Sequence, residues 1–218
     1  PNPTKADAVR DLGARLVLSG TTFDDAREHA TALAAEDRSR LVSAANEPLL
    51  VAGVATAYLE LLADAPDLPP RPAPAGGGPG APPARHAAPA LAPGPAGVAV
   101  QSAASPAAHD SWRARDLVAR PNTSRAEGLA TGTGFALTQA VLREHLDDFV
   151  LVDDDTIDRA AALYLTAART VAEGAGAAAL AAGLADPDRV AGRRVGVVCS
   201  GGNASPAELR RVSAHLPR

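Results

Sequence analysis

The sequence predicts an α/β fold with a mostly parallel sheet. Short apolar runs alternate along the chain with stretches of helical length, and glycine or proline stands at many of the junctions. The clearest run is residues 194–200 (RVGVVCS), which has the pattern of a buried strand and passes directly into Gly201, Gly202 and Asn203. Strands that are separated by helices form βαβ units, so we expect parallel pairing.

The N-terminal residues begin this alternation. Residues 4–12 have the pattern of a short helix, which Gly13 ends because glycine readily adopts the left-handed conformation of a C-terminal cap. Residues 15–19 (RLVLS) are an apolar run that Gly20 closes, and we expect a buried strand there.

Two helices and a short strand follow. Thr22 can cap a helix over residues 22–36, whose first turn carries acids that favour the positive end of the helix dipole. Residues 41–43 are expected to form a short strand. Residues 49–62 are mostly apolar, so we expect a well-buried helix.

Residues 66–95 interrupt the alternation, because they hold 11 of the 19 prolines of the chain. Their composition predicts a linker or an irregular loop. Within them, Gly76, Gly77 and Gly78 can gather backbone N–H groups around a phosphate. On composition alone a flexible spacer is the favoured interpretation, since the Lys-Ser/Thr pair of a P-loop does not follow.

The alternation then resumes to the end of the chain. Asp154 or Asp155 is expected to cap a long helix that reaches about Val171, and Ser205 to cap the last helix, with Glu208 completing a capping box. The other elements expected here are strands at residues 97–101 and 149–152 and helices at residues 105–115, 134–144 and 173–185.

Composition excludes several classes of protein. The net charge is −4 and aromatic residues make up 3% of the chain, so clustered cations and stacking rings for nucleic acid are lacking. A single cysteine cannot build a disulfide framework. Neither a membrane-spanning run nor a secretory signal is visible, and we expect a cytoplasmic protein that binds neither nucleic acid nor membrane.

Few polar clusters have the spacing of a site. Ser200 and the glycines after it form either a ligand-binding turn or an ordinary strand-to-helix connection. Cys199 should face the other side of the strand and is expected in the core. The carboxylates of residues 147–148 and 153–155 can bind a cation, but flanking an edge strand and capping a helix is the favoured interpretation. The histidines show no metal-ligand spacing.

Several short segments together resemble, in order, the pyridoxal-phosphate-dependent threonine/serine ammonia-lyases of the tryptophan-synthase-β-like fold. The resemblance covers nearly the whole chain. The segments that carry it are residues 5–18, Asn46-Glu47-Pro48, Val51-Ala52-Gly53, Gly76-Gly77-Gly78, residues 100–107, Glu127-Gly128-Leu129-Ala130, residues 173–180 and Cys199-Ser200-Gly201-Gly202-Asn203.

The resemblance implies a fold, a cofactor and a reaction. Residues 1–45 would be the trailing part of a small mobile domain, and residues 46–218 the large cofactor-binding domain. Gly76, Gly77 and Gly78 would hold the phosphate of pyridoxal phosphate, and Ser200 would hydrogen-bond its pyridine nitrogen. The reaction would be β-elimination of water from a hydroxy amino acid, which gives a 2-oxo acid and ammonia. Homo-oligomers are also implied, because family members commonly assemble as dimers or tetramers.

The chain also departs from the family pattern. The Schiff-base lysine of the family lies in an upstream motif that these residues do not contain, and Lys5 corresponds to a surface position, so no catalytic residue is assigned. Gly174 replaces a usual proline, and Gln101 replaces an acid that binds a cation in some relatives, so no metal is expected. Prolines that conflict with the family's strand, glycine loop and helix are Pro72, Pro74, Pro79, Pro82, Pro83 and Pro89.

These departures leave two hypotheses. The chain is either an incomplete piece of an ammonia-lyase that needs its lysine from elsewhere, or a non-catalytic, degenerate homologue that acts by binding a partner. A folded phosphate-binding loop between residues 67 and 97 favours the first hypothesis, and a spacer there favours the second.

Overall fold

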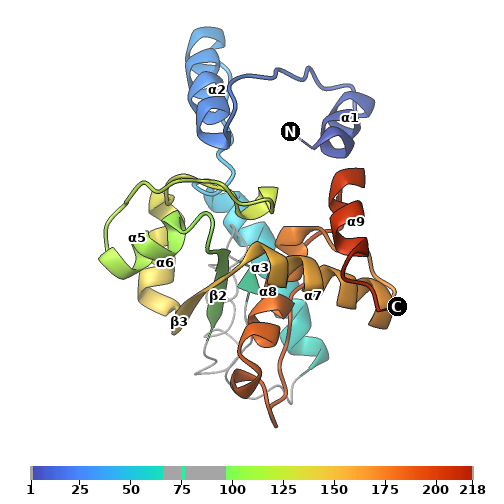
Figure 1. The fold of residues 1–218 in the computed structure, drawn as a ribbon. Coiled ribbons are helices and arrows are strands. Elements are labelled where there is room, and N and C mark those ends of the chain that lie inside the picture. The colour runs from blue at the N-terminus through green and yellow to red at the C-terminus, as the bar shows by residue number, and fades with distance from the viewer. Residues whose placement is uncertain (1, 66–74, 77–96, 218) are drawn as a thin grey trace.

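A computed structural model describes residues 2–65, 75–76 and 97–217 of the chain. Its centre is a three-stranded parallel sheet with strand order β1-β2-β3 (Figure 1). The strands are β1 (Ala75–Gly76), β2 (Val98–Ser102) and β3 (Asp148–Val152). The predicted α/β class with a parallel sheet is confirmed, as are the strands expected near residues 97–101 and 149–152.

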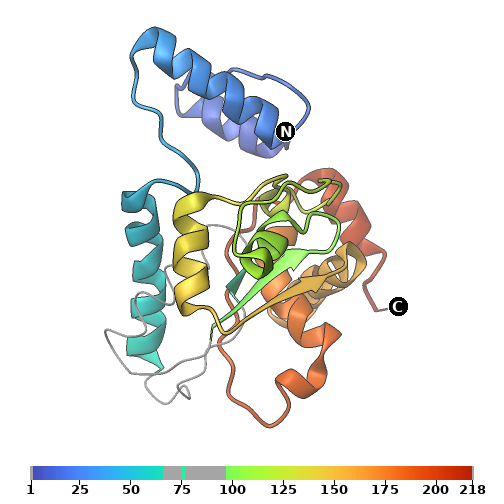
Figure 2. The same ribbon diagram turned by 90° about the vertical axis from the view of Figure 1, so that its left-hand side faces the viewer.

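Helices cover both faces of this sheet (Figure 2). Val100, Val150 and Val152 point to one face, where they pack against α7 (Asp154–Ala167) and the alanine-rich α8 (Gly174–Ala185). Ala99 and Phe149 point to the other face, where the core includes Tyr58 and Leu142. The helices on that side are α3 (Pro48–Asp64), α5 (Ala107–Ala114) and α6 (Ala136–His145). Alternate residues of each strand are therefore buried in different layers, as a doubly covered sheet requires.

The remaining helices lie outside these two layers. In Figures 1 and 2, α1 (Pro3–Asp11) and α2 (Phe23–Asp37) sit at one end of the molecule, and α1 lies beside α9 (Pro206–Ser213). Two short 3₁₀ helices, η1 (Glu127–Leu129) and η2 (Pro187–Arg189), complete the described elements. Three predicted caps are confirmed: Gly13 has φ +78°, and capping boxes begin α2 at Thr22 and α9 at Ser205. The predicted cap of α7 is wrong: Asp153, rather than Asp154 or Asp155, caps the helix because its carboxylate accepts from the Thr156 N–H, and the helix ends at Ala167 rather than near Val171.

Three predicted strands are wrong. Residues 15–19, 41–43 and 194–200 are extended or irregular, and none of them joins the sheet in the described part of the chain. An apolar run favours a strand, but the strand forms only where a neighbour accepts and donates the ladder hydrogen bonds. Cys199 is consequently exposed rather than in the core, because no sheet buries one side of its segment.

The helix expected at residues 49–62 forms as α3, but its predicted deep burial is wrong. Tyr58 is 8% exposed, whereas Leu49 and Leu50 near the start of the helix are 69% and 44% exposed. One side of α3 therefore packs on the sheet and the other leaves apolar side chains open. The glycines Gly77 and Gly78 and the six prolines that conflict with the family pattern lie outside the described residues.

Tyr58 supplies a test of this packing. Burial raises its pKa to about 12, and burial also raises the pKa of Tyr164, the other tyrosine of the chain. An unfolded tyrosine ionises at about pH 10. The stability that the neutral, buried Tyr58 contributes is therefore present below that pH and is lost as the pH rises toward 12. We expect a spectrophotometric titration to show both phenolates forming late, and Tyr58→Phe to remove the later phase. Ionisation of both near pH 10 in the folded chain contradicts the packing.

Candidate functional site

The candidate site lies at the carboxyl edge of the sheet, where ligands bind in open parallel sheets. Gly76 is the last residue of β1 and is paired in register with Val100 of β2. It is thus the one predicted phosphate-binding glycine that the structure describes, and it is the last described residue of its strand. The other two glycines follow it in sequence.

The turn that contains Ser200 packs against the beginning of α8. The Gly201 carbonyl accepts a hydrogen bond from the Glu173 N–H at 3.0 Å. A Cβ on Gly201 would lie 2.4 Å from Glu173 Oε1, and a Cβ on Gly202 would lie 2.7 Å from the Val171 carbonyl oxygen. Gly202 is therefore required by close contact with backbone, whereas the Glu173 side chain could move to accommodate a Cβ at Gly201.

Ser200 is exposed on this turn. Its side chain makes no hydrogen bond with any residue in the described part of the chain. A hydroxyl can both donate and accept, so Ser200 is available to a heteroatom of a ligand. Its neighbour Cys199 is also exposed.

A buried carboxylate from α9 holds the N-terminus of α8. Glu208 is 8% exposed, and its Oε1 accepts from the Gly174 N–H at 2.6 Å while its Oε2 accepts from the Ser205 N–H at 3.3 Å. Glu173, the N-cap of α8, makes no side-chain capping bond of its own. Sequence reasoning identified Glu208 only as the capping residue of α9, since nothing local signals a bond across 34 positions.

The N-terminal helix α1 is tied to the same region. Lys5 Nζ donates to Glu173 Oε2 at 2.5 Å, and Asn2 Nδ2 donates to the Asn203 carbonyl at 2.7 Å. The Lys5 side chain is 33% exposed, so it is a half-buried partner of Glu173 rather than an open surface amine. Lys5 and Glu173 are 168 positions apart, and no local sequence signal connects them.

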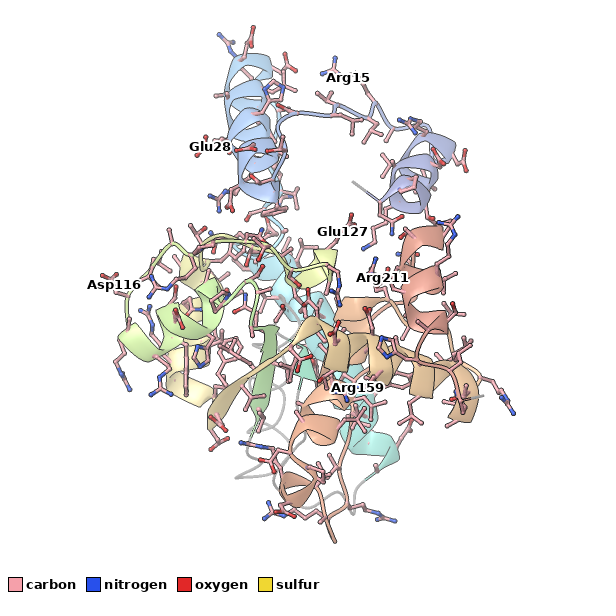
Figure 3. The ribbon with its side chains drawn as sticks, viewed as in Figure 1. Arg15, Glu28, Asp116, Glu127, Arg159 and Arg211 are labelled. Atoms are coloured by element: carbon pink, nitrogen blue, oxygen red, sulfur yellow. The ribbon has the colours of Figure 1, made fainter. Side chains whose placement is uncertain are left out.

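A small polar hollow of about 120 Å³ lies between these parts. Figure 3 shows two of its lining residues, Glu127 near η1 and Arg211 on α9. Buried Asp158 accepts from Arg125 at 3.1 Å and from Arg211 at 3.4 Å. Hydrogen bonding to Asp155, with the nearby carboxylates, raises the pKa of Arg125. Both arginines are therefore paired with carboxylates of the protein itself.

The carboxylates of residues 147–148 and 153–155 have structural partners, as the favoured interpretation predicted. Asp153 is the N-cap of α7, and its bonds from Thr156 lower the pKa of the Asp153 carboxyl. Asp154 accepts from Ser102 Oγ at 2.6 Å and from Ser124 Oγ at 2.9 Å. No group of three His, Cys, Asp or Glu side chains in residues 2–65, 75–76 and 97–217 is arranged to hold a metal ion.

Gln101 also has a protein partner. It is 1% exposed and its Oε1 accepts from the His109 N–H at 3.0 Å, which caps the first turn of α5. None of the helices in the described part of the chain is long and apolar enough to cross a membrane.

Comparison with known proteins places these residues in context. A family profile described as "Pyridoxal-phosphate dependent enzyme" matches residues 1–201. The chain is 32% identical over 212 residues to the L-threonine ammonia-lyase of Thermotoga maritima, covering 96% of the chain and 52% of that protein. It is 34% identical to the L-threonine ammonia-lyase of Geobacter sulfurreducens, covering 83% of the chain and 45% of that protein. The chain thus spans about half the length of these curated relatives.

Solved structures of threonine deaminases superpose on this chain. The T.th. threonine deaminase superposes with a TM-score of 0.82 at 33% identity, covering 92% of this chain and 67% of that one. The processed form of threonine deaminase isoform 2 from Solanum lycopersicum superposes with a TM-score of 0.87 at 26% identity, covering 98% of this chain and 63% of that one.

Proposed function

The chain belongs to the family of pyridoxal-phosphate-dependent enzymes, and from that premise we propose that it forms the cofactor-phosphate and cofactor-ring side of a threonine or serine ammonia-lyase. Members of the family depend on pyridoxal phosphate. The observation that carries the proposal is the Ser200 hydroxyl, which is exposed and without a partner in the described residues, on a turn that packs against α8. An exposed hydroxyl without a protein partner can exchange water for a ligand heteroatom, as donor or as acceptor.

The residues have separate roles in this proposal. Gly76, Gly77 and Gly78 donate backbone N–H groups to the phosphate, and Ser200 donates its hydroxyl to the pyridine nitrogen. When bound, the cofactor supplies an electron sink that makes elimination of the β-hydroxyl feasible. A neutral hydroxyl does not hold the ring nitrogen protonated as a carboxylate would, which favours elimination over transamination. Lys5, the only lysine in the sequence, is paired with Glu173, so we assign it no catalytic role.

We extend the proposal to the organisation of the protein. Residues 1–45 belong to a smaller domain and residues 46–218 to the large domain. This division is supported by burial, since Ala6 is the only buried residue within α1 and α2. The substrate is an amino acid with a β-hydroxyl, the protein assembles as a homo-oligomer, and its location is the cytoplasm.

The test uses 4′-deoxypyridoxine 5′-phosphate, a cofactor analogue without the aldehyde, because its binding requires no lysine. We expect equilibrium dialysis to show saturable binding, and Ser200→Ala to weaken it about tenfold through loss of one hydrogen bond. Cys199→Ala, at the adjacent exposed position, should bind as the original chain does.

Two results contradict the proposal. Absence of saturable binding, or equal binding by Ser200→Ala, supports the degenerate homologue instead. Pyridoxal phosphate followed by borohydride and peptide mass spectrometry checks the lysine separately. We expect no stoichiometric adduct on Lys5, and such an adduct would show that the catalytic amine is present in the chain.

A further inference from the structure

A second hollow, of about 380 Å³, lies at the opposite edge of the sheet from the candidate site. It is bounded by the C-terminal ends of α5 and α6, which pack side by side in Figure 1, and by Asp148 at the start of β3. Its lining residues are Trp112, Arg113, Arg115, Arg143, Leu146 and Asp148. Small-molecule sites have volumes of roughly 300–1,000 Å³, so this hollow is large enough for a compact ligand.

Three guanidinium groups line this hollow without a carboxylate partner in the described residues. Arg113 and Arg115 are exposed and make no side-chain hydrogen bond or ion pair within the described part of the chain. Arg143 donates to the Ser111 carbonyl at 3.3 Å, and its buried Nε–H has no hydrogen-bond partner among the described residues. Asp148, the acid in the lining, is already paired with Arg189 at 2.8 Å.

The negative ends of the helix dipoles do not account for the positive charge of the three arginines. A helix C-terminus carries roughly half a negative charge, and two helices end here, so about one positive charge would suffice. Three cations leave an excess of about two positive charges, in a chain whose net charge is −4. Like charges gathered in this way repel one another, and an anion would relieve the repulsion.

We propose that this hollow binds a small phosphate-bearing anion. Guanidinium groups match the geometry of phosphate oxygens with paired N–H donors, and three of them line this hollow. Trp112 and Leu146 supply an apolar wall for the organic part of a phosphate ester. The site is independent of the proposed function, since it contains none of the residues assigned to the cofactor.

Trp112 is the single tryptophan of the chain, so its fluorescence reports on the hollow directly. The probes are inorganic pyrophosphate, phenyl phosphate and citrate, titrated at constant ionic strength without pyridoxal phosphate. We expect saturable changes with the two phosphates, and Arg143→Ala and Arg113→Ala should each weaken binding about tenfold. Arg210→Ala, which removes an exposed cation from α9, should have no effect.

Arg115→Gly separates binding from folding. Arg115 has φ +55°, a conformation that glycine adopts at less cost, so this variant should melt at a higher temperature and yet bind phosphate more weakly. The proposal is overturned if sodium chloride alone reproduces the fluorescence change, if citrate binds more tightly than both phosphates, or if Arg113→Ala binds as well as Arg210→Ala.

Discussion

Gly176→Ala should destabilise the chain by about 2 kcal/mol, because the new methyl group has no space. A Cβ at Gly176 would lie 2.3 Å from the Gly201 carbonyl oxygen and 3.0 Å from the Gly201 nitrogen. These are backbone atoms of the turn that follows Ser200, so either α8 or the turn must move. We expect a lower urea midpoint with an unchanged slope, and weaker binding of the aldehyde-free cofactor analogue, since the turn carries Ser200.

Gly183→Ala is the matched control in the same helix. A Cβ at Gly183 would lie 3.6 Å from Val190 Cγ1, an ordinary contact, and alanine is favoured over glycine in a helix interior. The free energy of unfolding of this variant should therefore be higher by roughly 0.5–1 kcal/mol, and the variant should bind the analogue normally. Equal stability of the two variants would show that the turn does not pack against α8 as described.

Glu208→Ala should lower the free energy of unfolding by about 3 kcal/mol, because it removes hydrogen-bond acceptors from two helix N-termini at once. The Gly174 N–H would be left buried without its partner, and the Ser205 N–H would lose its part of the capping box. Glu208→Gln keeps an amide oxygen in reach of Gly174 and should recover most of the loss. Urea unfolding measures both variants, and amide exchange of Gly174 reports the missing bond directly.

Asp25→Ala supplies the comparison for this carboxylate. Asp25 occupies the same capping-box position in α2, where its bonds from the Thr21 and Thr22 N–H groups lower the pKa of its carboxyl. It is exposed at the surface and reaches no second helix in the described part of the chain. Asp25→Ala should therefore lower the free energy of unfolding markedly less than Glu208→Ala does. If the two alanine variants lose equal stability, the bond from Glu208 to Gly174 contributes nothing.

Most helices could be predicted because their determinants are close together in sequence. Thr22 and Ser205 were identified as N-caps from residues within one turn, and the structure confirms both capping boxes. The strand at β2 was predicted within one residue for the same kind of reason, since a run of small and branched apolar residues favours a covered parallel strand. Residues 194–200 had the same pattern and still did not form a strand.

In the candidate site, too, the residues found from short motifs could be predicted, and the contacts between distant residues could not. Gly76 and Ser200 were identified from short motifs that resemble a family, and the family is confirmed by the match over residues 1–201. The contacts that hold the site could not be identified from one sequence. Lys5 and Glu173 are 168 positions apart, and Gly174 and Glu208 are 34 apart, with no local signal of either pairing.

The sequence by itself therefore determined the α/β class, the helix caps, the family and the candidate residues for the cofactor. Only the tertiary structure decided which apolar runs became strands, how Glu208 caps α8, and that three arginines share one hollow. The physical reason is the range of the interactions. Caps and helix propensity act over a few residues, whereas ladder hydrogen bonds, buried carboxylates and clustered charges depend on partners that only the folded chain brings together.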